Sequence, residues 1–450
     1  MKIVIAGGGK VGSVLCAELT SQKHDVMLIE TNETIFDQLM SRYDLSGVIG
    51  NAASYEIQQE VGINKTDIFI AVTDTDEINI IASILAKSLG ARYTVARVRN
   101  PEYSQHAHEV SESLGIDLMI NPEQEAAKTI SHMIKFPTVV HAQKFMSSDV
   151  ELLEVVVKAD SPLENVTMAD FKDKFGDLLV CAIVRSDQVI VPNANDTLKA
   201  GDRIDVLGSQ NDIYKFYQQI RTERHRLKSV MIIGGGRLTY YLLNYLREFH
   251  LDIKVIEWKE EAAEQLSAAF PEVEVILGDS TEQELLLQEG VGNYDVFVSL
   301  LGIDEENIMA SLFAQQQGVS KVITKVNREA LFSLFKNFGL DTIITPKRLI
   351  ANSILRFVRS LGNPSVSYLE ELYRLSDNQA ELIQFKVNNS SKVLNTPLEQ
   401  LNLKDNTLIA YILRDHKTII PSGQDRLEVG DHVIIMTNAA TMDDIDDILR

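Results

Sequence analysis

Short apolar runs alternate along the first part of the chain with segments whose apolar residues recur at helical spacing. Four of these runs are rich in Val and Ile, as is typical of buried strands. They span residues 2–6, 25–30, 68–72 and 93–98. The segments between them predict helices over residues 10–22, 32–41, 54–61 and 77–89. Alternating strands and helices indicate a parallel sheet covered on both faces, so we predict an α/β fold with a Rossmann-like, doubly wound domain.

The same pattern returns in the second half of the chain. Predicted strands there span residues 229–233, 252–257, 295–300 and 320–326. Matching landmarks are separated by a nearly constant distance: Gly234 follows Gly7 by 227 residues, and Gly430 follows Gly201 by 229. Solenoid repeats are only about 20–50 residues long. The long offset therefore indicates an internal duplication of a unit that contains more than one domain.

A smaller segment follows each predicted sheet domain. In the first half it comprises an extended run over residues 151–158, a helix over 166–175, a hairpin that turns at Ser186 and Asp187, and an amphipathic helix near 211–221. Strands and helices mixed in this way predict a small α+β subdomain. We expect the second half to end in a subdomain built in the same order.

In each half, one longer helical segment connects the sheet to its small subdomain. These segments span residues 122–135 in the first half and 346–375 in the second. With these connections the chain divides into four expected domains. They are two Rossmann-like nucleotide-binding domains at residues 1–135 and 228–362, and two small subdomains at 136–227 and 363–450.

Composition and charge limit the class of protein. No apolar run reaches the roughly 18 residues of a membrane span, and the N-terminus lacks the features of a signal peptide. The chain has only two cysteines, which do not form a disulfide framework or a zinc spacing, so we expect a cytoplasmic protein. The net charge of −21 argues against non-specific nucleic-acid binding. It would suit a basic surface such as the cytoplasmic face of a membrane protein.

The first predicted strand leads into the motif Gly7-x-Gly9-x-x-Gly12, which opens a helix. In this context Gly7 permits a tight turn, Gly9 lets the backbone approach a pyrophosphate, and Gly12 allows the helix to pack closely on the sheet. The N-terminus of the helix attracts phosphate. The candidate cofactor-binding residues of this loop are Gly7, Gly8, Gly9, Lys10, Val11 and Gly12.

Polar residues at the ends of the other predicted strands complete the candidate site. Glu30 ends the second strand, where a carboxylate accepts hydrogen bonds from ribose and repels a 2′-phosphate, so NAD or an adenine nucleotide is favoured over NADP. Thr73 and Asp74 follow the next predicted strand, and Asn51 could face the adenosine. Arg97 is either a phosphate ligand or part of a surface salt bridge.

The second glycine loop departs from the first at its third position, where Thr239 replaces glycine. The branched side chain is expected to push the helix slightly off the sheet. This loop is therefore either a second nucleotide site or a retained fold with an altered pocket. Its candidate cofactor-binding residues are Gly234, Gly235, Gly236, Arg237, Leu238, Glu257 and Asp279. Leu301 and Gly302 replace the polar pair of the first half, and Lys325 stands near the place of Arg97.

A dehydrogenase requires a substrate domain with a general acid or base. The small subdomains offer no such candidate, because their polar residues fit turns. We therefore expect no catalytic residues, no metal site and no enzyme activity. An NAD-dependent oxidoreductase with its chemistry between the two halves is kept as an alternative.

The order of motifs "AGGGKVG", "LIE", "AVTDTDEIN", "ARVRNPEY" and "INPEQEAA", followed by a small hairpin unit and then repeated, resembles the family of Trk-type potassium uptake regulatory subunits, TrkA. The resemblance covers essentially the whole chain. It implies two fused RCK units, each with a Rossmann-like RCK_N domain and an RCK_C subdomain. "GGGRLT" and "SLLGIDEEN" in the second half depart from the motifs of the first.

The resemblance also implies a function. A member of this family is expected to be a cytoplasmic gating ring, a homotetramer on the inner face of the membrane, attached to a TrkH-like potassium-translocating subunit. NAD+, NADH, ATP or ADP would change the shape of the ring. A second alternative is an RCK regulator that senses a cyclic dinucleotide in its RCK_C units.

Overall fold

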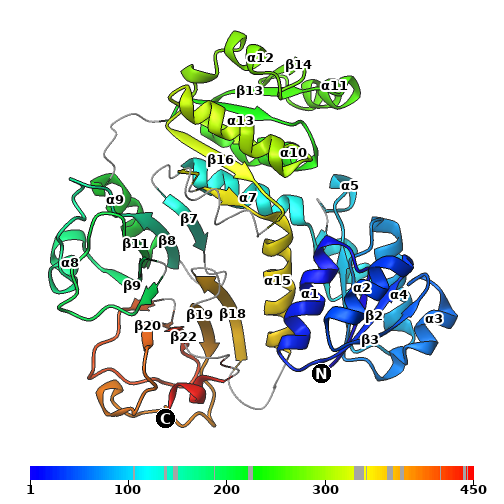
Figure 1. Ribbon diagram of the computed structural model, residues 1–450. Helices are drawn as coiled ribbons and strands as arrows, with labels where there is room; N and C mark the ends of the chain where they lie inside the picture. Colours follow the sequence, from blue (N-terminus) through cyan, green and yellow to red (C-terminus); the bar gives the residue numbers. More distant parts are fainter. Residues whose placement is uncertain are drawn as a thin grey trace. The chain divides into compact units, whose positions relative to one another are not determined.

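The chain folds into two compact units, one formed by Met1–Ser131 with Leu227–Leu355 and the other by His132–Arg226 with Arg356–Arg450 (Figure 1). Each unit thus combines segments from both halves of the sequence. The structure is a computed structural model. The residues it describes are 1–104, 107–135, 139–144, 150–186, 188–220, 227–328, 339–340, 342–361, 368–375, 380–415, 417–438, 442 and 444–450.

The first half begins with a parallel six-stranded sheet in the order β3-β2-β1-β4-β5-β6. This is a doubly wound arrangement and confirms the predicted fold class. Its strands are β1 (Lys2–Ala6), β2 (Asp25–Glu30), β3 (Ser46–Ile49), β4 (Ile68–Ala71), β5 (Tyr93–Arg97) and β6 (Leu118–Ile120). Its helices are α1 (Lys10–Ser21), α2 (Glu33–Arg42), α3 (Tyr55–Glu60), α4 (Asp76–Ser88), α5 (Pro101–Ser104), α6 (Ala107–Leu114) and α7 (Pro122–Lys135).

The central strands are buried on both faces, which explains their continuous apolar sequence. Ile3, Val4 and Ile5 of β1 have no solvent exposure. β1 pairs in parallel with β2 on one side and β4 on the other. The chain builds the sheet outward from β1, first on the side of β2 and β3 and then on the side of β4, β5 and β6. Ligands of such sheets bind at the carboxyl end of the strands where this order reverses, which here is beside β1.

The second sheet repeats the first in the order β14-β13-β12-β15-β16-β17. Its strands are β12 (Ser229–Ile233), β13 (Asp252–Glu257), β14 (Glu274–Leu277), β15 (Val296–Ser299), β16 (Lys321–Lys325) and β17 (Ile343–Ile344). Its helices are α10 (Arg237–Leu246), α11 (Glu260–Ala269), α12 (Gln283–Gln288), α13 (Asp304–Gln316) and α15 (Pro346–Ser360). The internal duplication is therefore present in three dimensions.

The small subdomains contain antiparallel five-stranded sheets in the orders β10-β9-β11-β8-β7 and β18-β19-β22-β20-β21. The first has β7 (Val139–Lys144), β8 (Val150–Val156), β9 (Leu178–Arg185), β10 (Gln188–Ile190), β11 (Arg203–Ser209), α8 (Met168–Phe175) and α9 (Gln210–Ile220). The second has β18 (Tyr368–Leu375), β19 (Ala380–Lys386), β20 (Thr407–Arg414), β21 (Lys417–Ile419) and β22 (His432–Thr437).

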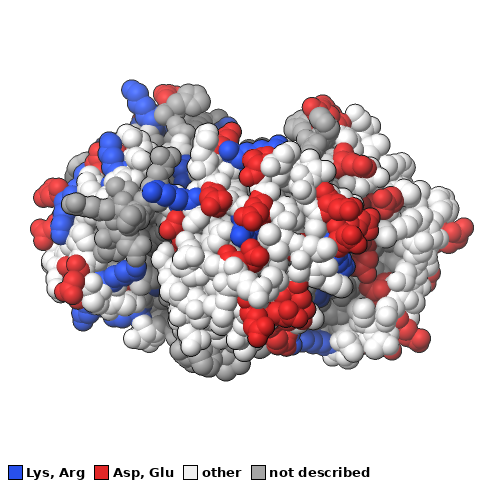
Figure 2. All heavy atoms as spheres, turned by 90° about the horizontal axis from the view of Figure 1, so that it is seen from above, with Lys and Arg blue, Asp and Glu red and all other residues white. Residues whose placement is uncertain are grey.

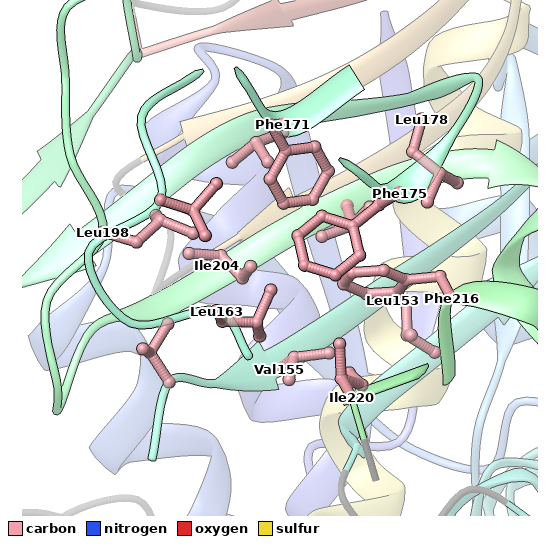
Figure 3. Close-up of a cluster of buried hydrophobic side chains, with 14 of the residues drawn as sticks. Leu153, Val155, Leu163, Phe171, Phe175, Leu178, Leu198, Ile204, Phe216 and Ile220 are labelled. Atoms are coloured by element: carbon pink, nitrogen blue, oxygen red, sulfur yellow. The ribbon is translucent and has the colours of Figure 1, made fainter. Parts of the chain in front are cut away.

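Aromatic side chains on the helices of the first small subdomain form the centre of its core. Phe171 and Phe175 of α8 pack against Phe216 of α9, with ring centroids 5.8 and 5.3 Å from that of Phe216 (Figure 3). The N-terminus of α8 is capped by Thr167, whose side chain accepts a hydrogen bond from the amide of Asp170. The helix predicted there is thus held at its start by a cap and along its length by burial.

Two predicted elements of the second half are corrected. The helix predicted over 346–375 ends at Ser360, and residues 368–375 form strand β18, which pairs with β19. The amphipathic helix expected at the end of the chain is the short 3-10 helix Ile445–Ile448, whose two isoleucines are fully buried. In both places tertiary pairing and burial decide the local structure, which a periodicity of apolar residues does not reveal.

Candidate functional site

Backbone crowding explains two of the three glycines in the first loop. Gly7 has φ +102°, and a Cβ there would lie 2.9 Å from the amide nitrogen of Thr73. A Cβ on Gly12 would lie 1.8 Å from the carbonyl oxygen of Gly7. The two glycines therefore allow β1, α1 and the segment after β4 to approach one another closely.

Gly9 faces open space instead. No described heavy atom lies within 4 Å of the position that its Cβ would take. Gly9 is the N-cap of α1 and has no side chain to satisfy the first amides of that helix. These amides and the exposed Lys10 are suited to receive an anion. Val11 is 5% exposed, so its side chain belongs to the core and only its backbone can contribute.

The carboxylate of Glu30 is held in place by backbone amides. Its Oε2 accepts a hydrogen bond from Gly8 N at 2.5 Å, and its Oε1 accepts from the amides of Thr31 and Asn32 at 2.8 and 2.9 Å. Oε1 also accepts from the Thr31 hydroxyl. Oε1 has no further capacity, whereas Oε2 has one donor and can accept from a ligand hydroxyl. Glu30 is 8% exposed.

Asn79 of α4 links the residues at the ends of β4 and β5. Its Oδ1 accepts from the amide and the hydroxyl of Thr73 at 2.8 and 2.7 Å, and its Nδ2 donates to the carbonyl of Arg97 at 2.9 Å. Asn79 is fully buried. Sequence reasoning missed this residue, although its recurrence in "DEINI" and "DEENI" was a usable signal. Asn307 of the second half bonds Leu301 in the same way, at 2.7 Å.

Arg97 is a buried cation with an unsatisfied donor. It is 9% exposed, its guanidinium donates to the Thr73 carbonyl, and its Nε has no hydrogen-bond partner among the described residues. The exposed carboxylate of Asp74 lies 4.0 Å away. Burial lowers the pKa of Arg97, and the charge of Arg99 lowers it further. A phosphate bound at this edge of the sheet would offset this buried positive charge.

A cavity of about 400 Å³ opens beside the loop. Of the residues expected from sequence, it brings together Gly7, Gly9, Glu30, Asn51, Thr73 and Asp74. Gly8, Lys10, Val11, Gly12 and Arg97 do not line it. Sequence reasoning missed further lining residues that follow the strand ends or lie on the next helix: Thr31, Asn32, Ile35, Thr75 and Ile78. The side chain of Asn51 closes its own turn by accepting from Ala53 N at 2.9 Å.

The second loop keeps the backbone arrangement of the first. Gly234 has φ +92°, and Gly236 again faces open space. Glu257 accepts from Gly235 N at 2.5 Å through Oε2 and from Lys259 N at 2.8 Å through Oε1. Thr239 is 1% exposed and its hydroxyl donates to the carbonyl of Gly234. The residue that replaces the third glycine therefore satisfies its polar atom on the loop itself.

The residues expected near the phosphates differ more between the two loops than the backbone does. Lys325 donates from Nζ to the Leu300 carbonyl at 2.9 Å, and burial lowers its pKa to about 8. Arg237 is exposed, whereas Leu238 is buried like Val11. Asp279 accepts through Oδ1 from the amide and hydroxyl of Thr281, and these bonds lower its pKa. A lysine in place of a guanidinium presents a single point charge.

The surroundings of the two loops are linked through the start of α7. Asn121 donates from Nδ2 to the Tyr241 hydroxyl at 2.8 Å, and that hydroxyl donates to the Arg99 carbonyl at 2.9 Å. Burial raises the pKa of Glu123, whereas Arg99, Arg97 and Arg237 lower it. On the face shown in Figure 2, acidic side chains gather into clusters.

Comparisons with known proteins agree with the duplicated fold. The TrkA-N domain matches residues 3–122 and 230–346, and the TrkA-C domain matches residues 152–221 and 382–450. Trk system potassium uptake protein TrkA homolog 1 of Methanosarcina mazei is 30% identical, with 99% of each chain covered. Trk system potassium uptake protein TrkA of Vibrio alginolyticus is 28% identical, with 100% of this chain and 99% of the relative covered.

Solved structures share the fold at low sequence identity. The GsuK channel bound to NAD has a TM-score of 0.67 and 15% identity, and the match covers 97% of this chain and 76% of the channel. The GsuK bound to ADP has a TM-score of 0.51 and 14% identity, covering 79% of this chain and 69% of that chain. At these identities both likenesses show a shared fold, in agreement with the sheets described above.

Proposed function

This chain belongs to the TrkA family of Trk system potassium uptake proteins, and from that membership we propose that it is a regulatory subunit that gates a Trk-type potassium uptake system. Its ligand is NAD+ or NADH, or an adenine nucleotide such as ATP or ADP, held at the first glycine loop. The observation that carries the proposal is the cavity of about 400 Å³ between the loop, Glu30 and Thr73.

Different residues of the site contact the ribose and the phosphates of the ligand. Oε2 of Glu30 accepts a hydrogen bond from a ribose hydroxyl, and Asn51 lies beside the base. The first amides of α1, at Lys10 and Val11, receive phosphate oxygens with help from the Lys10 ammonium. Arg97 lies behind Thr73, outside the cavity lining, and adds its positive charge to the phosphate side. The corresponding second set is Gly234, Gly235, Gly236, Arg237, Leu238, Glu257 and Asp279.

Binding regulates by shifting a population of conformations. A ligand can do this only if it binds one conformation more tightly than the other. Arg97 suits this role because its guanidinium contacts Thr73 and its backbone is tied to α4 through Asn79. A phosphate that is attracted by the charge of Arg97 would therefore affect the ends of both β4 and β5.

Family membership supports a proposal for the assembly. We place the protein on the cytoplasmic face of the membrane as a homotetrameric ring, attached to a TrkH-like potassium-translocating subunit. No helix in the described part of the chain is both long and apolar enough to span a bilayer. The net charge of −21 suits the basic cytoplasmic surface of a membrane protein. We propose that residues 1–135 and 228–362 form the two RCK_N domains and that residues 136–227 and 363–450 form the two RCK_C subdomains.

Calorimetry with NAD and ADP on the full-length protein tests the ligand assignment. Glu30→Gln should weaken binding roughly 10- to 140-fold, because a hydrogen bond to a charged group contributes about 1.5–3 kcal/mol. Glu33→Gln, an exposed change in the first turn of α2, is the matched control and should have no effect. Lys10→Gln should weaken both nucleotides and leave adenosine unaffected.

The proposal fails if Glu30→Gln and Lys10→Gln both retain wild-type affinity for NAD and ADP. An unchanged circular dichroism spectrum of each variant would exclude loss of structure as the cause of weaker binding. In vesicles that contain the membrane subunit, the same variants should lose the dependence of potassium flux on nucleotide. Turnover of NADH with a substrate would instead support the oxidoreductase alternative, which neither the geometry nor the names of the relatives favour.

A further inference from the structure

Two large apolar side chains are exposed beside the second glycine loop. Trp258 is 66% exposed and Ile303 is 52% exposed. They occupy the positions that Thr31 and Thr75 hold in the first half, and both of those threonines line the first cavity. The duplication has thus replaced two small polar rim residues with apolar ones. Exposed large apolar side chains are often part of ligand-binding surfaces.

The turn that carries Trp258 keeps two of the backbone hydrogen bonds found at the corresponding turn of the first half. The carboxylate before it accepts from Gly235 N and Lys259 N, as Glu30 accepts from Gly8 N and Asn32 N. Because these two amides hold the carboxylate in both halves, Trp258 occupies the place in the turn that Thr31 occupies in the first half. The indole therefore starts from a position that borders the nucleoside side of the site.

We propose that Trp258 is the stacking surface for the nucleobase in the second site, with Ile303 opposite it on the rim. The ligand class is a purine nucleotide. This inference rests on the proposed function, because it assumes that the duplicated loop binds the same chemical class as the first. It assigns a specificity-determining residue that the glycine motif does not contain.

The differences on the phosphate side agree with this assignment. Lys325, whose Nζ is already bonded to the Leu300 carbonyl, replaces the guanidinium of Arg97. Leu301 and Gly302 replace Thr73 and Asp74. Because Lys325 Nζ is already bonded to a carbonyl, a larger share of the binding free energy is expected to come from the base. An indole face supplies it, since aromatic stacking acts on any purine and depends little on sequence-specific hydrogen bonds.

A nearby cation also favours an electron-rich ring at this place. Nζ of Lys259 lies 5.2 Å from the centroid of the Trp258 ring. Such a contact at an exposed site is weakly attractive. The other rim residue comes from a different element, the segment before α13, so the two apolar groups approach the site from two sides.

Tryptophan fluorescence tests the proposal directly, because Trp258 is the only tryptophan of the chain. Full-length protein is titrated with ADP and, separately, with AMP, with excitation at the red edge of the indole band where adenine does not absorb. Saturable quenching by both ligands is expected. In calorimetry, Trp258→Ala should weaken one class of site about 5- to 140-fold, because base stacking contributes about 1–3 kcal/mol. Trp258→Phe should restore most of the affinity.

The control variants separate this inference from the proposed function. Tyr214→Ala removes an aromatic ring that is 51% exposed on α9 and should leave both classes of site unchanged. Glu30→Gln should weaken only the class that does not quench fluorescence. If ADP binds to the first site while the fluorescence and the Trp258→Ala isotherm stay unchanged, the inference is wrong and the proposed function stands. If no nucleotide binds at all, the proposed function itself fails.

Discussion

Single glycines show how closely the two loops are constrained. Gly12 and Thr239 hold the same place in the duplicated motif, yet only the first position is closed to a side chain by the Gly7 carbonyl. In the second half the hydroxyl of Thr239 bonds the corresponding carbonyl of Gly234. The sequence prediction that Thr239 would push the helix slightly off the sheet rested on bulk alone and did not consider this bond. Whether the second loop binds nucleotide stays a prediction.

Gly9 and Gly12 should respond differently to the same change. Gly12→Ala is expected to lower the free energy of unfolding by at least about 1–3 kcal/mol, because its Cβ would lie 1.8 Å from an oxygen. Gly9→Ala meets open space and should cost less than about 1 kcal/mol, while weakening nucleotide binding by blocking the approach of the pyrophosphate. Urea unfolding and calorimetry measure the two effects. Equal destabilisation by both changes would contradict this division of roles.

At the scale of elements, helix α4 does more than cover the sheet. Its buried Asn79 joins the ends of β4 and β5, and Asn307 of α13 bonds the segment after β15 in the same manner. The helices themselves were predictable from apolar periodicity. The role of an asparagine on the buried face was not, because it depends on two strand ends that come together only in the fold.

Replacing the two asparagines should separate stability from binding. Asn79→Ala leaves the amide of Thr73 and the carbonyl of Arg97 without this partner, so the free energy of unfolding should fall by about 1–3 kcal/mol. The affinity of the first site for ADP should fall as well. Asn307→Ala is the matched control, with a similar loss of stability and no effect at the first site. An unchanged first-site affinity in Asn79→Ala would show that Thr73 and Arg97 need no such support.

At the scale of the whole molecule, the duplicated small subdomains pack on each other through an apolar surface. Leu152 and Leu207 from the first copy cluster with Leu382, Tyr411 and Met436 from the second. The Tyr411 hydroxyl donates to the carbonyl of Leu207 at 3.2 Å. Family membership, predicted from the repeated motifs, is confirmed by domain matches in both halves. The pairing of the copies within one chain was not predicted.

Tyr411 should therefore contribute to the stability of this pairing. Tyr411→Phe removes one buried hydrogen bond and is expected to lower the free energy of unfolding by about 0.5–1.5 kcal/mol. Tyr411→Ala also leaves a cavity in the shared core and should cost about 3–5 kcal/mol. Denaturant unfolding measures both changes, with Tyr214→Phe on an exposed surface as the control. Equal stability of Tyr411→Ala and the wild type would show that the two copies do not depend on this contact.

The sequence by itself determined the duplication, the two parallel sheets and the positions of the glycine loops, because these depend on local periodicity and on motifs of fixed spacing. Only the tertiary structure decided which strand-end residues share a cavity and that Asn79 supports them. It also decided that residues 368–375 form a strand and that the final isoleucines are buried. Each of these depends on contacts between segments far apart in the chain, for which neighbouring residues carry no signal.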